Sequence, residues 1–435
     1  MTSVSKSISV AAILAAGITV AAPAPGAEDH PFGLKLTVSV SRTDNRDNIS
    51  DVDGIKKEED TFVRVYPTFS YEKQLADRYD LRLYYRPTYV WRENPGVGGT
   101  ESEWNHGVDA WLRFQISPLT EIMISDNYWW SGEKDWNYGD GYVYSPEDRV
   151  LRNDTHWGNK ITVVLDRDFS DDFHASLSAS YAMKRYDNDA FRNRYDEDTI
   201  TILAQLNKRL SRNLSWGLFS QYVIFDRGSH GAIEDDEVRI DNGVVYWING
   251  VQLDYDVFGN KRFVFIGRTG YNYLWYEADE VEDDDMFGDS SIELSIYQQE
   301  RTRGKFGFRI GKTHSDLFPY SSQDDMAFYG SISTVIGRNS TLRIGADAEY
   351  RTRSYDLITI DSEAENAAYW QKWVADSGYK ATGDRNSVWL RLWAEYEFTK
   401  KIMGSVFYSF EDVDSDVDNE YTENIVGASL TVKFF

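Results

Sequence analysis

The sequence predicts an all-β fold, namely a transmembrane, antiparallel, up-and-down β-barrel of about eighteen strands. Segments of about ten residues alternate apolar and polar side chains, which is the pattern of strands with one face in lipid and the other in a lumen. The connections between these segments are alternately short and long. The chain also begins with a candidate secretory signal and ends in an amphipathic strand over residues 424–435.

The N-terminal segment has the layout of a cleavable signal peptide. One cation, Lys6, precedes an apolar run from Ile8 to Ala22, and small residues follow as far as Ala27. The run is shorter than the ~20 residues that span a bilayer as a helix, which argues against a permanent anchor. We therefore expect a signal peptide over residues 1–27, with cleavage after Ala27 favoured over Ala24, and a single barrel domain over residues 28–435.

The composition agrees with an exported barrel. The chain has no cysteine, so its stability would not depend on disulfides in an oxidising periplasm. Aromatic residues make up 15% of the chain and only 9 residues are proline, which suits interfacial girdles and an uninterrupted strand ladder. The formal net charge of −25 argues against nucleic acid as a partner, because binding to phosphates requires a basic surface.

The first strands show the period of two most clearly. In the segment 32–40, Leu34, Leu36 and Val38 share one face, and polar residues share the other. The next two strands are expected at 62–71 and 81–91 on either side of a tight turn.

The same rhythm continues to the C-terminus. Short turns are expected near residues 75–78, 117–119, 168–171, 211–213, 258–260, 302–304, 337–340 and 399–401. Long loops are expected at about 43–59, 131–150, 226–241, 277–290 and 353–386. Because short turns of outer-membrane barrels lie on the periplasmic side and the strand number is even, both termini are expected in the periplasm.

Some segments fit this pattern less well. Asn249 and Asp126 fall on apolar strand faces, and residues 291–314 form a hairpin only if 302–304 is its turn. A barrel of sixteen strands is therefore the alternative. The segment 364–375 has the spacing of a short amphipathic helix, and it is free either to fold inward as a constriction or to lie on the surface.

The polar strand face lines the lumen of such a barrel and supplies the candidates for the functional site. The predicted pore-lining residues are Arg64, Arg82, Arg86, Arg113, Arg268, Arg309, Arg343, Arg391, Trp111, Trp389 and Trp393. Basic residues modestly outnumber acidic ones in this reading, which favours anions or acidic sugars as solutes. Alternatively, the acidic and basic side chains pair across the lumen and only keep it hydrated, without selecting a solute. The tryptophans either stack on sugar rings or fill space.

Acidic residues concentrate in three segments assigned to loops, 234–237, 277–285 and 411–416. Solvated loop tips explain them. A second interpretation is that divalent cations bridge them to outer-leaflet glycolipid, since oxygen ligands suit calcium and magnesium. The sequence contains no calcium-loop motif, so no cofactor and no defined metal site are predicted.

The pattern of residues 62–71, followed by 81–85 and by the terminal strand, resembles the family of large β-barrel porins of Gram-negative outer membranes. The resemblance implies passive diffusion of small hydrophilic solutes and carries no catalytic motif. In such barrels the last phenylalanine is usually in phase with the apolar face. Here Phe434 is in phase with Val432 and Leu430, and Phe435 lies one residue beyond.

Three functions remain in order of preference. The first is a porin-like channel, as a monomer or a trimer, in contact with lipid and glycolipid. The second is a plugged or partner-gated barrel that serves as a scaffold or conduit for surface polymer. The third is an outer-membrane hydrolase, for which His106 and His156 near the outer rim are the candidates. The chain contains neither G-x-S-x-G nor H-E-x-x-H, so we predict no enzyme.

Overall fold

The computed structural model describes most of the chain between Pro31 and Phe434. The described residues are 31–45, 59–76, 78–94, 101–131, 155–186, 196–227, 230–231, 239–240, 243–259, 263–276, 287–297, 301–314, 320–337, 341–357, 368, 371–372, 382–416 and 420–434. The predicted signal peptide, 1–27, lies outside them.

An 18-stranded sheet forms the wall of the molecule. Its strands are β1 (Phe32–Thr43), β2 (Asp60–Ala76), β3 (Tyr79–Arg92), β4 (Ser102–Ser117), β5 (Thr120–Ser131), β6 (His156–Ser170), β7 (Phe173–Tyr186), β8 (Glu197–Arg209), β9 (Leu214–Arg227), β12 (Val244–Asp256), β13 (Phe263–Tyr276), β14 (Phe287–Tyr297), β15 (Thr302–His314), β16 (Tyr320–Ile336), β17 (Leu342–Leu357), β18 (Thr382–Thr399), β19 (Ile402–Ser415) and β20 (Tyr421–Lys433). The short strands β10 (His230–Gly231) and β11 (Arg239–Ile240) form a separate two-stranded sheet.

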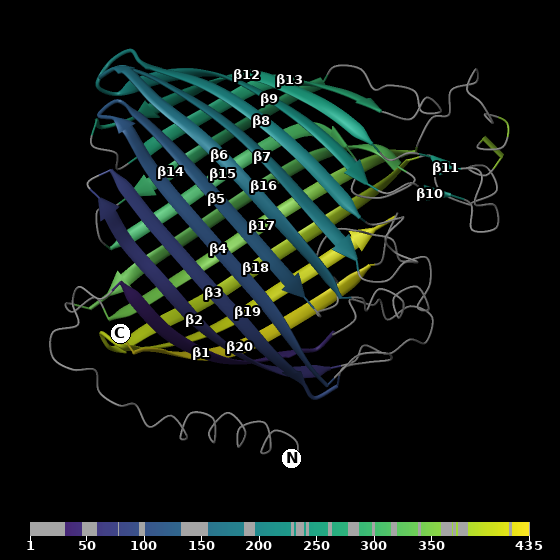
Figure 1. The fold of residues 1–435 in the computed structure, drawn as a ribbon. Helices are drawn as coiled ribbons and strands as arrows, with labels where there is room; N and C mark the ends of the chain where they lie inside the picture. The colour runs from purple at the N-terminus through teal and green to yellow at the C-terminus, as the bar shows by residue number, and fades with distance from the viewer. Residues whose placement is uncertain are drawn as a thin grey trace.

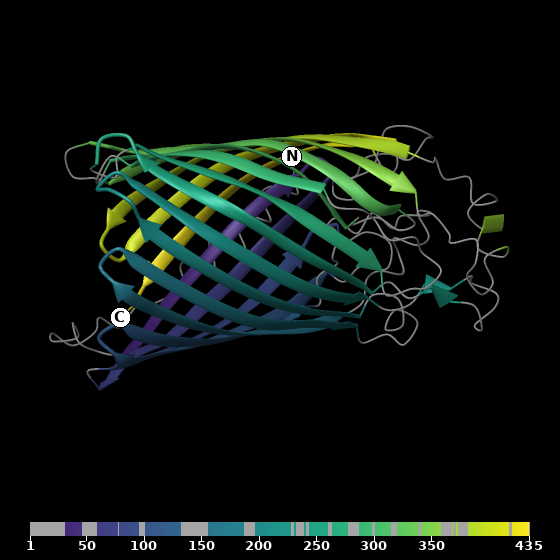
Figure 2. The ribbon, with the colours of Figure 1, turned by 90° about the horizontal axis from the view of Figure 1, so that it is seen from above.

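The wall closes on itself. Each strand pairs antiparallel with the next wall strand, and β20 pairs with β1 from Lys35↔Lys433 to Thr43↔Ile425 (Figures 1 and 2). A closed ladder lets backbone donors and acceptors of the wall pair within the protein, which a bilayer requires because lipid offers no partners. The predicted up-and-down barrel of eighteen strands is confirmed, and the alternative of sixteen is excluded.

The two ends of the barrel differ. Short turns gather at one end, where the C-terminus also lies (Figure 1). The first strand begins at the same end, because Phe32 pairs with Tyr71 beside the β2–β3 turn. The backbone N–H of Phe434 donates to the carbonyl of Leu34 at 2.9 Å and fastens the C-terminus there. The first and last strands therefore share the short-turn end.

The structure corrects several predicted boundaries. Residues 302–304 belong to β15, which begins at Thr302, and β14 ends at Tyr297, so 302–304 is not the turn of this hairpin. The predicted loop 353–386 is shorter, since β17 continues to Leu357 and β18 starts at Thr382. The ends of these strands carry several charged residues, so their sequence lacks the alternation of apolar and polar side chains and resembles a loop. In the segment 364–375, Ala368, Gln371 and Lys372 are helical, and the remaining residues lie outside the described part.

The acidic segment 411–416 is also a strand rather than a loop for most of its length. Glu411 to Ser415 complete β19, with Glu411 opposite Trp389 and Glu423. The alternation of residues places Glu411 on the polar face of the sheet and Asp412 on the other. The other two acidic segments, 234–237 and 277–285, lie outside the described residues.

One face of the wall is apolar and exposed. The register puts the following residues on it: Leu83, Val108, Ile124, Val163, Leu177, Ile202, Leu218, Val251, Phe265, Ile292, Phe306, Phe328, Ile344, Leu392, Val406 and Leu430, all exposed. An apolar face of this extent on a closed barrel is the surface that meets lipid. No helix among the described residues is long and apolar enough to cross a membrane.

Polar residues interrupt this apolar face at the two positions that the sequence singled out. Asp126 lies between Ala110 and Ile161 in the register and accepts a hydrogen bond from the amide of Asn159 at 2.8 Å. Asn249 lies on the same outer face of β12. The unexpected polar pattern at these positions is therefore genuine and does not signal an error in register.

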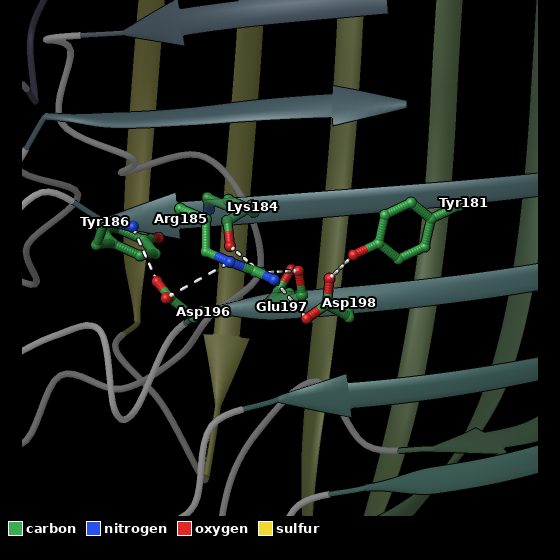
Figure 3. A network of polar contacts seen from close by, with 7 residues as sticks. All are labelled: Tyr181, Lys184, Arg185, Tyr186, Asp196, Glu197 and Asp198. Carbon is green, nitrogen blue, oxygen red and sulfur yellow. Dashed lines mark hydrogen bonds and ion pairs between the residues drawn. The ribbon is translucent and has the colours of Figure 1, made fainter. Parts of the chain in front are cut away.

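At the long-loop ends of β7 and β8, an outward-facing network replaces the apolar surface (Figure 3). Arg185 donates to Asp198 at 2.6 Å, and Asp198 also accepts the hydroxyl of Tyr181 at 2.6 Å. Asp196 lies 3.8 Å from Arg185 and accepts the backbone N–H of Tyr186 at 2.9 Å. The network ties the ends of the two strands together where the apolar surface stops.

The two faces of one strand predict opposite tolerance to charge. Ile202 and Thr201 are neighbours on β8, with Ile202 on the apolar face and Thr201 on the polar face. Ile202→Arg should lower the free energy of unfolding in lipid vesicles by about 2–4 kcal/mol, because arginine is costly inside the bilayer. Thr201→Arg is the matched control and should cost clearly less. Urea titrations followed by tryptophan fluorescence measure both, and equal losses would contradict the assignment of faces.

Candidate functional site: the inner wall

The polar face of the sheet is the inner wall of the barrel. A recess is lined by residues of β17, β18, β19 and β20 that all share this face, as only the concave side of four adjacent strands allows. The eight arginines and three tryptophans predicted to line the pore all lie on this face: Arg64, Arg82, Arg86, Arg113, Arg268, Arg309, Arg343, Arg391, Trp111, Trp389 and Trp393. They are spread around the wall and do not form one cluster.

The expected excess of basic residues on this wall is not found. On the described strands, the inward-facing acidic residues are about equal in number to the inward-facing basic residues. Inward-facing residues that the predicted pore lining lacks are Glu72, Glu121, Glu293, Asp325, Glu411, Glu423, Arg351, Arg353 and Arg385. Several of these residues lie in segments predicted as loops or in the hairpin 291–314, and the period of two identifies their face once the strand ends are known. The wall is therefore mixed in charge.

Three of the predicted arginines are held by carboxylates. Arg86 forms an ion pair with Asp109. Arg113 donates to Glu121 at 2.6 Å, and its Nη1 lies 3.8 Å from Asp80. All these groups are partly exposed, so each pair contributes little stability and acts mainly to fix the side chains on the wall. Arg309 is the third, and its partners belong to a larger node.

That node centres on Asp325, a carboxylate only 13% exposed on β16. Arg351 binds it with two parallel hydrogen bonds of 2.7 Å, from Nε and from Nη2. The Nη2 atom of Arg309 lies 3.5 Å from Asp325 and 4.0 Å from Glu349. The node links β15, β16 and β17, and the fork of Arg351 matches the carboxylate in both geometry and charge.

Four other predicted arginines are stacked on aromatic rings. The guanidinium carbon lies 4.7 Å from the ring centroid of Trp111 for Arg82, and 4.8 Å from that of Phe407 for Arg391. Arg268 lies 3.8 Å from the ring of Phe219 and Arg64 lies 4.6 Å from that of Phe62. Such a contact supports the guanidinium on the ring without a carboxylate. The remaining arginine, Arg343, lies opposite Glu395 in the register.

The three predicted tryptophans have different surroundings. Trp111 lies beneath Arg82. Trp393 lies across Gly345, where any larger side chain would meet its ring, and its indole N–H donates to Asp347 at 2.9 Å. Trp389 lines the recess. The three rings therefore do not form a continuous track for sugars, and Trp389 is the one placed beside a recess in the described part of the wall.

The recess has a volume of about 530 Å³. It is lined by Glu349, Arg351, Arg353, Arg385, Ser387, Trp389, Ser409, Glu411, Tyr421, Glu423 and Ile425. These residues occupy the long-loop halves of β17, β18, β19 and β20, and Trp389 is the one among them that belongs to the predicted set of pore-lining arginines and tryptophans. The recess combines charges of both signs with an aromatic surface.

The histidines considered for a hydrolase lie apart. His106 is on the outer face of β4, where its Nδ1 lies 3.0 Å from the hydroxyl of Tyr85 and its ring packs near Trp130. His156 is buried on the inner face of β6 beside Tyr186. In the described part of the chain, no three His, Cys, Asp or Glu side chains are grouped so that they could hold a metal ion.

No protein-family model and no curated protein matches this sequence. Several solved structures resemble it at low similarity. OccAB4 of Acinetobacter baumannii has a TM-score of 0.48 and 10% identity over 94% of this chain and 100% of its own. The outer membrane protein OpdK from Pseudomonas aeruginosa has a TM-score of 0.47 and 10% identity over 92% and 98%. The siderophore receptor PirA from Acinetobacter baumannii has a TM-score of 0.49 and 8% identity over 93% and 81%. At these values the likenesses carry no argument about function.

The Asp325 node predicts a local stability effect. Asp325→Asn removes the charge that faces Arg309 and Arg351, so it should lower the free energy of unfolding by about 1–3 kcal/mol. Asp324→Asn makes the same change one residue away, on the opposite face of β16, and serves as the control. Urea unfolding in lipid vesicles compares the two. A loss for Asp325→Asn no greater than that for Asp324→Asn would show that the node does not stabilise the wall.

Proposed function

We propose that this protein is a porin-like channel in the outer membrane of a Gram-negative bacterium, through which small hydrophilic solutes diffuse passively. One observation carries the proposal: a closed wall of strands separates an apolar outer face from an inner face of charged and hydrogen-bonding groups. Such a wall places a polar path inside an apolar belt. On this reading the short-turn end, with both ends of the barrel wall, faces the periplasm.

The mixed charge of the wall supports selection by local groups rather than by net charge. Arginines stacked on rings, such as Arg82 and Arg391, present N–H donors to an anion or to the carboxylate of a solute. Arginines paired with carboxylates contribute less to such attraction, because a local counter-charge offsets them. We therefore expect weak ion selectivity overall, with a contribution toward anions from the stacked arginines.

The outer-face network at Tyr181, Arg185 and Asp198 supports a contact with lipid head groups. It lies where the apolar surface ends and brings charged groups to the outside of the barrel (Figure 3). Arg185 is paired with Asp196 and Asp198 there, so the group has more carboxylates than cations, and divalent cations would bridge it to the anionic groups of outer-leaflet glycolipid. This part of the proposal concerns anchoring of the barrel and not passage of solute.

Conductance of the refolded protein in a planar bilayer tests the channel. We expect stable single-channel steps under a salt gradient. Folded, inserted protein that stays silent would refute the open channel and favour a plugged or partner-gated scaffold. Folding is verified beforehand by the shift in electrophoretic mobility between unheated and heated samples.

Selectivity tests the role of the stacked arginines. The double variant Arg82→Ser/Arg391→Ser should lower the permeability ratio of chloride to potassium, because two inward-facing positive charges are lost. Arg167→Ser removes a charge from the outer face of β6 and should leave the reversal potential unchanged. An unchanged reversal potential in the double variant would show that these two arginines do not contribute to ion selectivity.

A further inference from the structure

Two opposite charges face each other on the inner wall without pairing. Asp347 of β17 and Arg391 of β18 are directly opposite in the register, and both lie on the inner face. Opposite charges in such cross-strand positions attract each other and stabilise a sheet when they pair. Within the described residues no ion pair joins these two, and each is held by an aromatic ring instead.

The ring that holds Asp347 is that of Trp393, two residues along β18 from Arg391. Its indole N–H donates to the Asp347 carboxylate at 2.9 Å. Trp393 is opposite Gly345 in the register, and a Cβ atom at Gly345 would overlap the indole ring. The ring therefore leans from β18 over β17 and holds the carboxylate on that strand.

The ring that supports Arg391 lies on the other side of β18. The guanidinium carbon is 4.8 Å from the ring centroid of Phe407 on β19. Phe407 is opposite Gly427 of β20, where a Cβ atom would overlap the phenylalanine ring. The ring thus leans away from β18, and Arg391 is drawn toward β19 while Asp347 is held on β17.

The two glycines make this separation possible. Side chains on a strand stand roughly perpendicular to the sheet, so a ring lies along the wall only where the next strand leaves room for it. The nearest atoms that a Cβ would meet at Gly345 and Gly427 belong to side chains, so alanine there would displace a ring and leave the strand ladder in place. At Gly250, by contrast, a Cβ would also meet the backbone carbonyl of Thr269.

The separation matters for the charge that the lumen contains. Arg391 is exposed on the inner face, and the ring of Phe407 does not itself neutralise it. A carboxylate in direct contact would offset most of that charge. Once the ring is displaced, Arg391 can close onto Asp347, which lies directly opposite.

We propose that Gly427 is a specificity-determining position of the channel. It makes room for the ring of Phe407, which keeps Arg391 from pairing with Asp347 and so preserves the attraction of Arg391 for anions. Gly345 acts in the same way for the carboxylate. Both glycines are positioning residues, because they act through the rings. The inference rests on the proposed channel function, since ion selectivity is its readout.

Reversal potentials under a salt gradient test the inference. Gly427→Ala should lower the permeability ratio of chloride to potassium by about twofold, within the range for one exposed ion pair, because Arg391 is released to Asp347. Gly404→Ala on β19 is the matched control, since its Cβ would also meet a phenylalanine ring, that of Phe398, but on the outer face. An unchanged ratio in Gly427→Ala, or an equal fall in Gly404→Ala, overturns the proposal.

A second substitution distinguishes pairing of the charges from general damage to the wall. Asp347→Asn removes a negative charge and should raise the ratio in the wild-type background. In the Gly427→Ala background it should raise the ratio by a larger factor, because it also frees Arg391 from its new partner. Equal factors in the two backgrounds overturn the proposed pairing.

Phe407→Leu decides the question even if Gly427→Ala fails to fold. It removes the ring without crowding Gly427, and it should lower the ratio as well because Arg391 loses its support. A wild-type ratio in Phe407→Leu overturns the proposal. Conduction by the wild type with unchanged selectivity in the variants removes this inference alone, whereas silence of the folded wild type removes the channel and this inference with it.

Discussion

Pairing of the last strand with the first is the constraint on which the rest of the structure depends. Lipid offers no hydrogen-bond partners, so an open sheet edge in a bilayer would leave a row of backbone groups unsatisfied. The β1–β20 ladder removes that edge, from Lys35↔Lys433 to Thr43↔Ile425. Closure in turn divides every strand into a residue set that meets lipid and a set that meets the lumen. All later properties of the molecule, including its recess, follow from that division.

The period of two explains how much of this fold could be predicted from sequence. Each long strand carries several alternations, so the architecture and the face of Arg391 or Trp111 can be predicted without knowledge of the partners. The predicted strand boundaries were wrong where the long-loop ends of β17, β18 and β19 carry charged residues on both faces. β17 and β18 have Arg353 and Arg385 near their ends, and β19 ends in a run of acids. Beyond the lipid there is no reason for a strand to alternate, so the pattern there resembles a loop.

The candidate site was predicted less well for the same reason. The recess lies in the part of the wall where alternation fades, and its Arg353, Arg385, Glu411 and Glu423 come from those segments. Which arginine is stacked and which is paired depends on the register between strands, and one sequence does not contain that information. Trp389 was recognised because it lies deeper, between Val388 and Leu390, within a clean alternation.

The inner wall uses two ways to keep an arginine in a polar lumen. A carboxylate, as with Asp325 and Arg351, fixes the side chain and cancels its field. An aromatic ring, as with Phe407 and Arg391, supports the side chain and does not itself neutralise the charge. Gly427 makes room for the ring of Phe407, so even the absence of a side chain contributes to the placement of that charge. A wall with no net excess of charge can therefore still have strong local electric fields. The positions of the aromatic rings that support arginines, rather than the number of arginines, determine where these fields act on a solute.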